Sequence, residues 1–237
     1  RAGYAVVTFY PGEVVPDEPA LAEAAIARLP GQNRGPKVGA VGAWAWSISR
    51  AVDIVAADAR FDQSNVAVFG HSRFGKAALL AAALDERITA VIANQSGRLG
   101  AAPTARDVGE SLDELNRRFP HWFPAVAQSA RANAPNLDQD ALLALIAPRA
   151  ILLGGASSDR WSDPVGSYEG AAAANDVYRL FGRDGLTQSS IGTPDYGADI
   201  AFFMRPGRHG IRDLDWTAAI AFLDARRNRT RYGQARP

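Results

Sequence analysis

The sequence predicts an α/β fold in which helices cover both faces of a mostly parallel sheet. Short β-branched and aromatic segments alternate with longer segments whose apolar residues recur every three or four positions. This alternation favours right-handed crossovers between parallel strands. The 237 residues are 47% hydrophobic and 22% charged, so one large core can be buried within a single domain.

The order of elements follows from these patterns. Segment 3–10, GYAVVTFY, is predicted to be a buried strand, and the Gly- and Pro-rich residues after it form a loop with room for one short helix. Residues 43–60 carry Trp44, Ile48 and Val52 at helical spacing and predict an amphipathic helix. The remaining elements are expected to be strand 65–70, helix 75–87, strand 88–94, an irregular region over 97–137, helix 138–147, strand 150–156, helix 163–182, strand 199–205 and helix 213–228.

Composition argues against several classes of protein. The formal net charge of +1 leaves no footprint for nucleic acid or an anionic membrane, although the basic end 225–237 is expected to be a solvated tail. Without cysteine, neither a disulfide framework nor a thiol nucleophile is available. No apolar run reaches the length of about 18 residues that a membrane span needs. We therefore expect a protein that binds neither nucleic acid nor membrane. We also expect it to be a monomer.

Ser72 occupies the predicted turn between strand 65–70 and helix 75–87, in the stretch GHSRFG. A serine there can simply cap the helix. It can also be the nucleophile of an elbow, where small neighbours let the hydroxyl stand above the sheet. Because the spacing is G-x-S-x-x-G rather than G-x-S-x-G, the nucleophile interpretation needs partners downstream.

Those partners occur in the order that an α/β-hydrolase requires, an acid and then a histidine. Asp159 follows the penultimate strand, and His209 lies in a Gly-flanked loop after the last strand. A histidine in isolation is more often a surface residue, but its place in this order favours catalysis. Asp163 precedes Pro164 and is better explained as a helix N-cap.

Several motifs taken together resemble the glucuronoyl esterases of carbohydrate esterase family fifteen, in particular its bacterial members. These motifs are GHSRFGKAAL, SGRLGAAPTARDVGES, RFPHWF, ALLALIAPRAILLGGASSDRWSDP and RPGRHGI. The resemblance implies an α/β-hydrolase fold and hydrolysis of the ester between (4-O-methyl)-glucuronic acid of glucuronoxylan and a lignin alcohol. It also implies that no metal or other cofactor is needed, and that the enzyme is secreted or periplasmic.

The resemblance assigns roles to individual residues. Ser72 matches the nucleophile, His209 the general base, and Arg73 the arginine that stabilises the oxyanion, a role that suits a guanidinium in a site with little water. Arg73 could otherwise be a solvated surface residue, Lys76 a solvated helix residue and Trp161 a core aromatic. The residues that match the sugar-binding site are Lys76, Glu110 and Trp161.

One position departs from the pattern of the family. Many members place the acid 23 residues after the serine, where this chain has Gln95. A glutamine can hydrogen-bond an imidazole but cannot stabilise an imidazolium by charge, so the acid is expected to be Asp159. On this basis Gln95→Glu should preserve activity, or partly restore it when Asp159 is changed to asparagine. His71 replaces the cysteine of fungal members, which favours the bacterial type.

In the order of hydrolase strands, segment 3–10 corresponds to the fourth strand and segment 65–70 to the fifth. We therefore expect residues 1–237 to be the C-terminal portion of one catalytic domain, with a lid-like insertion at about 97–137 and a signal peptide upstream. The first three strands of the fold are then absent from this chain, and the third of them belongs between the fourth and the fifth. Expressed alone, this portion is expected to aggregate or to be inactive, because the missing third strand leaves backbone groups of its two neighbours unpaired.

Two other functions stay open. A different carbohydrate esterase, such as an acetyl-xylan esterase, shares the triad but has no reason to keep Arg73, Lys76, Glu110 and Trp161 around one pocket. A noncatalytic carbohydrate-binding pseudoenzyme is suggested by Gln95 and by the absent N-terminal strands.

Overall fold

A computed structural model describes residues 3–30, 38–124 and 137–232, and within them four parallel strands form one sheet. The order in the sheet is the order in the chain, β1-β2-β3-β4. Ala67 pairs with Ala90, Ala90 with Ala150, and Ile151 with Ile200. The strands are β1 (Ala67–His71), β2 (Ala90–Asn94), β3 (Ala150–Ala156) and β4 (Ile200–Arg205).

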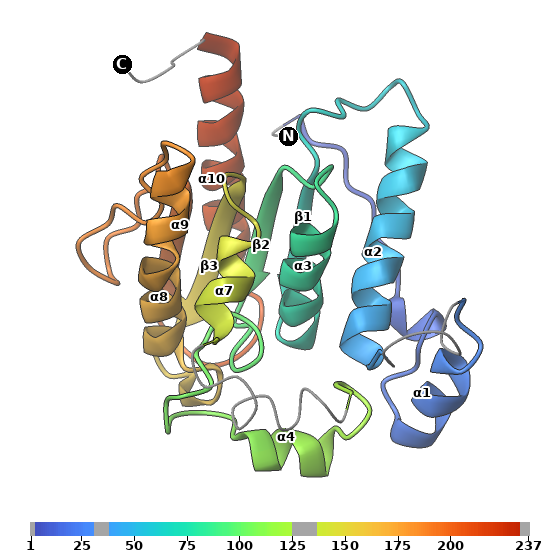
Figure 1. The fold of residues 1–237 in the computed structure, drawn as a ribbon. Helices are drawn as coiled ribbons and strands as arrows, with labels where there is room; N and C mark the ends of the chain where they lie inside the picture. Colours follow the sequence, from blue (N-terminus) through green and yellow to red (C-terminus); the bar gives the residue numbers. More distant parts are fainter. Residues whose placement is uncertain (1–2, 31–37, 125–136, 233–237) are drawn as a thin grey trace.

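Helices cover both faces of this sheet, as the sequence predicts. Most of the helices pack in a layer on one face, whereas α10 (Asp213–Tyr232) lies alone on the opposite face among the described elements (Figure 1). The layer contains α2 (Ala40–Ala56), α3 (Arg73–Leu84), α7 (Gln139–Ala144), α8 (Pro164–Ala173) and α9 (Asn175–Leu180). A short turn η1 (Pro11–Glu13) and helix α1 (Pro19–Ile26) precede α2.

Strand β2 shows why the sheet must be covered on both sides. All five of its residues are buried, and their side chains alternate between the two faces. Val91 and Ala93 join the core beneath the helix layer, while Ala90 and Ile92 join a second core against α10. A strand buried on both faces has a continuous apolar sequence, and the first four residues of AVIAN are apolar.

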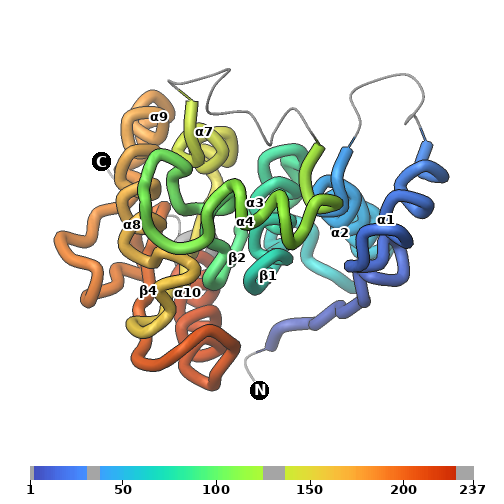
Figure 2. The backbone as a smooth tube through the Cα atoms, turned by 90° about the horizontal axis from the view of Figure 1, so that it is seen from below, coloured from blue at the N-terminus to red at the C-terminus, as the bar shows by residue number. Residues whose placement is uncertain are grey.

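The carboxyl ends of the strands share one edge of the sheet, at the bottom of Figure 1. Helix α4 (Leu112–Arg118) lies beyond this edge, and Figure 2, viewed from that end, shows α4 in front of α3 and β1. The loops after the four strands therefore lie at the same end of the sheet as α4.

The predicted strand over 3–10 is wrong. This segment has no strand structure and its apolar side chains are exposed, with Val6 81% and Tyr10 64% accessible. A strand requires a hydrogen-bonded neighbour, and in the described part of the chain β1 pairs with β2 alone. The segment is tied instead to α10, where the Tyr4 hydroxyl donates to Asp224 at 2.8 Å.

Three further expectations change. The region 97–137 contains α4, capped by Ser111, and its residues 125–136 lie outside the described residues. The single helix predicted over 163–182 is two helices, because α8 ends before Ala174 and α9 starts at Asn175. The basic end is in part helical, since α10 continues to Tyr232, and residues 233–237 lie outside the described ranges.

No helix in the described ranges has both the length and the apolar character that crossing a membrane requires.

Gly70, at the tight turn between β1 and α3, has no room for a side chain. A Cβ on Gly70 would lie 2.1 Å from the carbonyl oxygen of Phe74, which is backbone and cannot swing away. Gly70→Ala should lower the free energy of unfolding by about 1–3 kcal/mol, measured by urea unfolding. Gly192→Ala is the matched control, because its Cβ meets nothing within 4 Å and should change stability by no more than about 0.5 kcal/mol. Equal unfolding midpoints for the two variants would contradict the tight turn.

Candidate active site

Ser72 sits in a strained turn at the carboxyl end of β1. Its backbone has φ 55° and ψ −125°, a left-handed conformation that non-glycine residues rarely adopt. Its N–H donates to Asn94 O at 2.8 Å, and its carbonyl accepts from Gly75 N at 2.8 Å and from Lys76 N at 3.2 Å. The side chain makes no capping bond to α3, so the simple helix-cap interpretation of this serine is wrong. The backbone hydrogen bonds fix Ser72 as the residue directly before α3.

His209 and Asp159 are brought together from the loops after β4 and β3. His209 Nδ1 lies 2.7 Å from Asp159 Oδ2. Because an ionised carboxylate only accepts, Nδ1 carries the proton and Nε2 is left as a base. The His209 side chain is 36% exposed and that of Asp159 only 2%, so the carboxylate lies behind the ring. This is the arrangement in which an acid orients a histidine toward a substrate.

The Asp159 carboxylate is kept ionised by its neighbours. Burial alone would raise its pKa, but hydrogen bonds from His209 and Ser162 outweigh burial and place the pKa below its ordinary value. Ser162 contributes both its hydroxyl, to Oδ2, and its N–H, at 3.3 Å from Oδ1. The negative charge that an imidazolium requires is therefore available at neutral pH.

Asp163, four residues after Asp159, is occupied elsewhere. Its side chain accepts from Gly166 N at 3.0 Å at the start of α8, where Pro164 takes the first helical position. The same carboxylate binds Arg106 Nε at 2.7 Å. The expected helix cap is confirmed.

A second imidazole packs against His209. The ring centroids of His71 and His209 are 4.7 Å apart, and His71 Nδ1 lies 3.3 Å from the amide nitrogen of Asn94. Burial, with the nearby charge of His209, lowers the pKa of His71 to about 4. His71 is therefore neutral near pH 7 and puts no positive charge against a His209 imidazolium. This ring also shows that His209 lies beside the residue that precedes Ser72.

Arg73 is fixed by an acidic partner that sequence reasoning missed. Its NH1 donates to Asp17 Oδ2, and its guanidinium lies over the rings of Trp122 and Phe119 at 5.0 and 5.8 Å from their centroids. Asp17 also accepts from Trp122 Nε1 at 2.7 Å and lies 2.9 Å from His121 Nε2. Burial would raise the pKa of Asp17, but these hydrogen bonds and the charge of Arg73 hold it below its ordinary value. Arg73 is thus a positioned side chain rather than a solvated one.

Lys76 and Glu110 form a buried ion pair beneath the turn. Their side chains are 2% and 5% exposed, and Lys76 Nζ lies 2.5 Å from Glu110 Oε1. Lys76 Nζ also donates to the carbonyls of Ser96 and Arg98. Burial lowers the pKa of Lys76, although the charge of Glu110 opposes this. Trp161 is joined to the pair through the backbone, because Glu110 N donates to Trp161 O at 3.0 Å.

The Gln95 side chain hydrogen-bonds the backbone of the residue that follows His209. Its Nε2 donates to Gly210 O at 3.1 Å, and its Oε1 accepts from Gly210 N at 2.9 Å. The amide therefore binds the backbone next to His209, whose imidazole is bound by Asp159.

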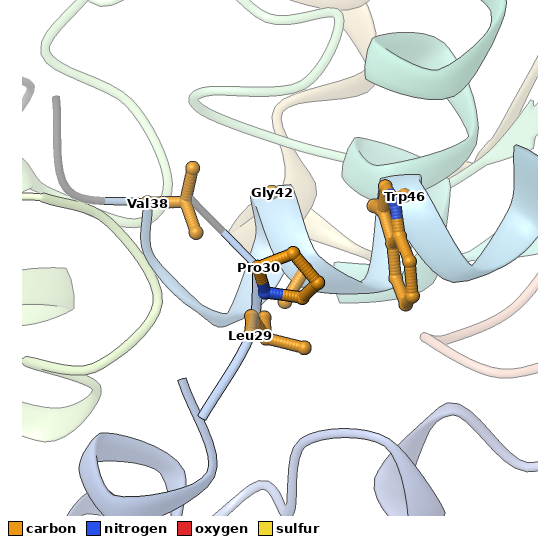
Figure 3. Close-up of a pocket in the computed structure, with 6 residues that line it drawn as sticks. Leu29, Pro30, Val38, Gly42 and Trp46 are labelled. Atoms are coloured by element: carbon orange, nitrogen blue, oxygen red, sulfur yellow. The ribbon is translucent and has the colours of Figure 1, made fainter. Parts of the chain in front are cut away.

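Two hollows lie apart from the predicted catalytic residues. A cavity of about 110 Å³ between the end of α1 and the start of α2 is lined by apolar groups, with Trp46 at one end (Figure 3). A larger one of about 480 Å³ lies in the loop 98–113. Neither is lined by Ser72 or His209. In the described ranges, no three or more His, Asp or Glu side chains converge as a metal site requires.

Comparison with known proteins identifies the family. The model of a family described as fungal glucuronyl esterase matches residues 1–182, which is most of this chain. The chain belongs to the glucuronoyl esterase family.

Individual relatives agree with this assignment. Carbohydrate esterase MZ0003, from an unknown prokaryotic organism, is 37% identical over 230 residues, which cover 94% of this chain and 53% of the relative. A 4-O-methyl-glucuronoyl methylesterase from Hypocrea jecorina is 31% identical over 65% of this chain and 36% of its own length. The solved glucuronoyl esterase from Solibacter usitatus superimposes with a TM-score of 0.80 at 38% identity, over 91% of this chain and 57% of that one.

These matches establish the fold, but they cover only part of each relative. The sheet and its helices belong to the α/β-hydrolase fold that glucuronoyl esterases share. The chain spans about half the length of the bacterial relatives it matches. Activity and substrate are therefore inferred for this chain from its own site.

The order of motifs along the chain identified both His209 and Asp159. It did not identify Asp17 and Ser162, which hydrogen-bond Arg73 and Asp159. Asp17 carries little signal, since an aspartate in a Pro-rich loop has many ordinary uses. Ser162 could be suspected because it lies three residues after Asp159, at the spacing of a short turn.

Exchange of the two neighbouring aspartates for asparagine should separate chemistry from stability. In the complete enzyme, Asp159→Asn removes the charge behind His209 and disturbs its tautomer, so kcat for an ester substrate should fall by about 10⁴, nearly as far as in Ser72→Ala. Asp163→Asn should leave kcat almost unchanged and lower the free energy of unfolding by about 1–2 kcal/mol, through a weaker cap and ion pair. A near-normal kcat in Asp159→Asn would remove this residue from the site.

The low pKa of His71 predicts how stability depends on pH. Between its ordinary value of 6.5 and about 4, the unfolded chain binds a proton at His71 that the folded chain does not. The free energy of unfolding is therefore not reduced by His71 above pH 6.5, and it decreases as the pH falls from 6.5 toward 4. Urea unfolding at pH 7 and pH 5 should show a loss of stability in the wild type that is smaller in His71→Gln. An equal loss in both proteins would show that His71 titrates normally.

Proposed function

We propose that this protein hydrolyses the ester between (4-O-methyl)-D-glucuronic acid of glucuronoxylan and an alcohol of lignin, by a Ser-His-Asp mechanism. The observation that carries the proposal is the 2.7 Å contact between His209 and Asp159, beside a serine in a strained turn. Membership of the glucuronoyl esterase family supports the substrate class. Because such a substrate is a wall polymer, we propose that the enzyme acts outside the cytoplasm.

Acylation begins when Ser72 Oγ attacks the ester carbonyl carbon and its proton passes to His209 Nε2. The imidazolium is stabilised by the Asp159 carboxylate, which stays ionised because of its lowered pKa. Collapse of the tetrahedral intermediate breaks the bond to the alcohol, which leaves with the proton from His209. Water then attacks the glucuronoyl-serine with His209 as base, and this releases glucuronic acid and free Ser72.

Arg73 supplies positive charge for the oxyanion of the tetrahedral intermediate. It is the first residue of α3, so its N–H lies at the helix N-terminus directly after the nucleophile. Among the bonds of the described residues, Asp17 engages NH1 of the guanidinium, which leaves Nε and NH2 as donors. A guanidinium held by one carboxylate and two aromatic rings needs little reorganisation when the oxyanion forms.

Lys76, Glu110 and Trp161 are proposed to bind the sugar. Lys76 already donates to three acceptors, so a sugar hydroxyl must replace one of the two carbonyl contacts. Glu110 uses Oε1 for Lys76, and its second oxygen can accept from a hydroxyl. Trp161 is partly exposed, with the Arg118 guanidinium 5.3 Å from its ring centroid, and can offer its other face to the sugar.

The test compares benzyl glucuronate with p-nitrophenyl acetate as substrates of the wild type, Trp161→Ala and Trp46→Ala. Trp46 is the matched control, because it is a partly exposed tryptophan with Arg50 at 5.5 Å and lines the separate cavity of Figure 3. Trp161→Ala should lower kcat/KM for the glucuronate by about tenfold, the equivalent of one lost aromatic contact, and leave acetate hydrolysis unchanged. Trp46→Ala should change neither rate.

Three results would contradict the proposal. Preference of the wild type for the acetate would favour an acetyl esterase. Binding of glucuronate without turnover would indicate a carbohydrate-binding pseudoenzyme. Equal losses on both substrates in Trp161→Ala would show that this tryptophan supports the fold rather than the sugar.

A further inference from the structure

We propose that Gln95 is a positioning residue that fixes the loop carrying His209, and that its side chain must be an amide rather than an acid. The inference rests on the proposed function, because His209 is taken as the general base. It starts from two hydrogen bonds across 115 residues of sequence, both between the Gln95 amide and the backbone of Gly210.

Gln95 is itself rigidly held. The residue is 3% exposed, and its N–H donates to Gly154 O of β3 at 2.7 Å. Its φ of 52° lies in the left-handed region, which turns the chain sharply at the end of β2. A side chain that starts from so fixed a backbone can transmit the position of the sheet to the loop it contacts.

The two bonds to Gly210 require both a donor and an acceptor on one side chain. Gly210 N is a donor 2.9 Å from Oε1, and Gly210 O is an acceptor 3.1 Å from Nε2. Glutamine satisfies both groups. An ionised glutamate would accept from the N–H but set its second oxygen against the carbonyl oxygen, which is repulsive and removes one of the donors to that carbonyl. These two hydrogen bonds predict that Gln95→Glu lowers activity, which is the opposite of the expectation from the sequence.

Arg205 also donates a hydrogen bond to the carbonyl of Gly210. It donates to Gly210 O and to Pro206 O, and its Nε lies 2.8 Å from Asp215 Oδ2. Arg205 and Asp215 are 2% and 3% exposed, and their charges satisfy one another. The loop 206–212 is therefore anchored to α10 by Arg205 and to β2 by Gln95.

The two hydrogen bonds between Gln95 and Gly210, called the clamp below, act on the residue next to His209. His209 Nδ1 must stay within hydrogen-bond reach of Asp159 while Nε2 faces the serine. A displacement of about 1 Å in a catalytic group can lower a rate by about 10². Because a shift of Gly210 is passed directly to His209, loss of the clamp should slow the chemical step and leave sugar binding intact.

The experiment uses the complete protein and the variants Gln95→Glu and Gln95→Met, with Gln188→Glu as the matched control. Gln188 is also a buried glutamine whose amide accepts from a backbone N–H, that of Phe202 at 2.8 Å, and donates to a carbonyl, that of Ser190 at 2.9 Å. Its change removes the same kind of contact outside the loop 206–212. Methionine at position 95 removes both bonds without adding charge.

Two readouts distinguish positioning from a purely structural role. The first is kinetics with benzyl glucuronate, where both Gln95 variants should lower kcat by about 10- to 100-fold and change KM by no more than about twofold. The second is the downfield proton NMR signal of His209 Nδ1–H in its bond to Asp159, identified by its loss in Asp159→Asn. This signal should shift or broaden in the Gln95 variants and be unchanged in Gln188→Glu.

Several results would overturn the proposal. An unchanged kcat and an unchanged signal in Gln95→Met would show that Gly210 needs no clamp. Equal losses in Gln188→Glu would show a general effect on folding. Activity in the Asp159→Asn/Gln95→Glu double variant above that of Asp159→Asn alone would assign position 95 to an acid. If the wild type does not cleave the glucuronate but the signal responds to Gln95 as described, the proposed function fails and the positioning role stands.

Discussion

Parallel pairing of the four strands is the constraint on which the site depends. Strands that run in one direction end at one edge, so each of the four loops delivers one polar residue to the same place. Ser72 follows β1 and Gln95 follows β2, while Asp159 and His209 follow β3 and β4. Residues far apart in the chain, such as His71 and His209 with ring centroids 4.7 Å apart, become neighbours through strand pairing rather than through local sequence.

Charged groups near this edge are stabilised in pairs or by backbone carbonyls. Lys76 faces Glu110, Arg73 faces Asp17, and Arg205 faces Asp215. Arg98, 6% exposed, instead donates to the carbonyls of Thr104, Arg106, Val108 and Glu110, and so folds this part of the insertion around one guanidinium. A buried charge left without partners is costly, so these contacts hold the loops in one arrangement. The imidazole of His209 is partly exposed and is held among these fixed neighbours.

The sequence predicted what depends on pattern and order, and it failed where structure depends on a distant partner. Strand 150–156 was located to the residue because AILLGGA is a continuous run without polar side chains, and all seven residues are buried; His209 with Asp159 followed from chain order. Segment 3–10 has the composition of a strand, but a strand also needs a neighbour to bond. Helix α4 has only seven residues, with a weak apolar pattern, and was hidden within a loop. The contacts of Asp17 and Gln95 span 56 and 115 residues, which no local pattern encodes.

An uncharged side chain at position 95 also suits the electrostatics of the site. His209 and Gly210 are consecutive, and their partners are Asp159 and Gln95, so both side chains approach one dipeptide. A carboxylate at position 95 would bring a second negative charge near Asp159, and like charges raise each other's pKa. The hydrogen bonds that keep the pKa of Asp159 low would then be opposed, and the acid would be less completely ionised when the imidazolium forms. With glutamine the tasks are divided, because the amide sets the position of the loop and a single carboxylate supplies the charge. Asp159, after β3, can therefore be the acid of the site without a second negative charge at position 95, after β2.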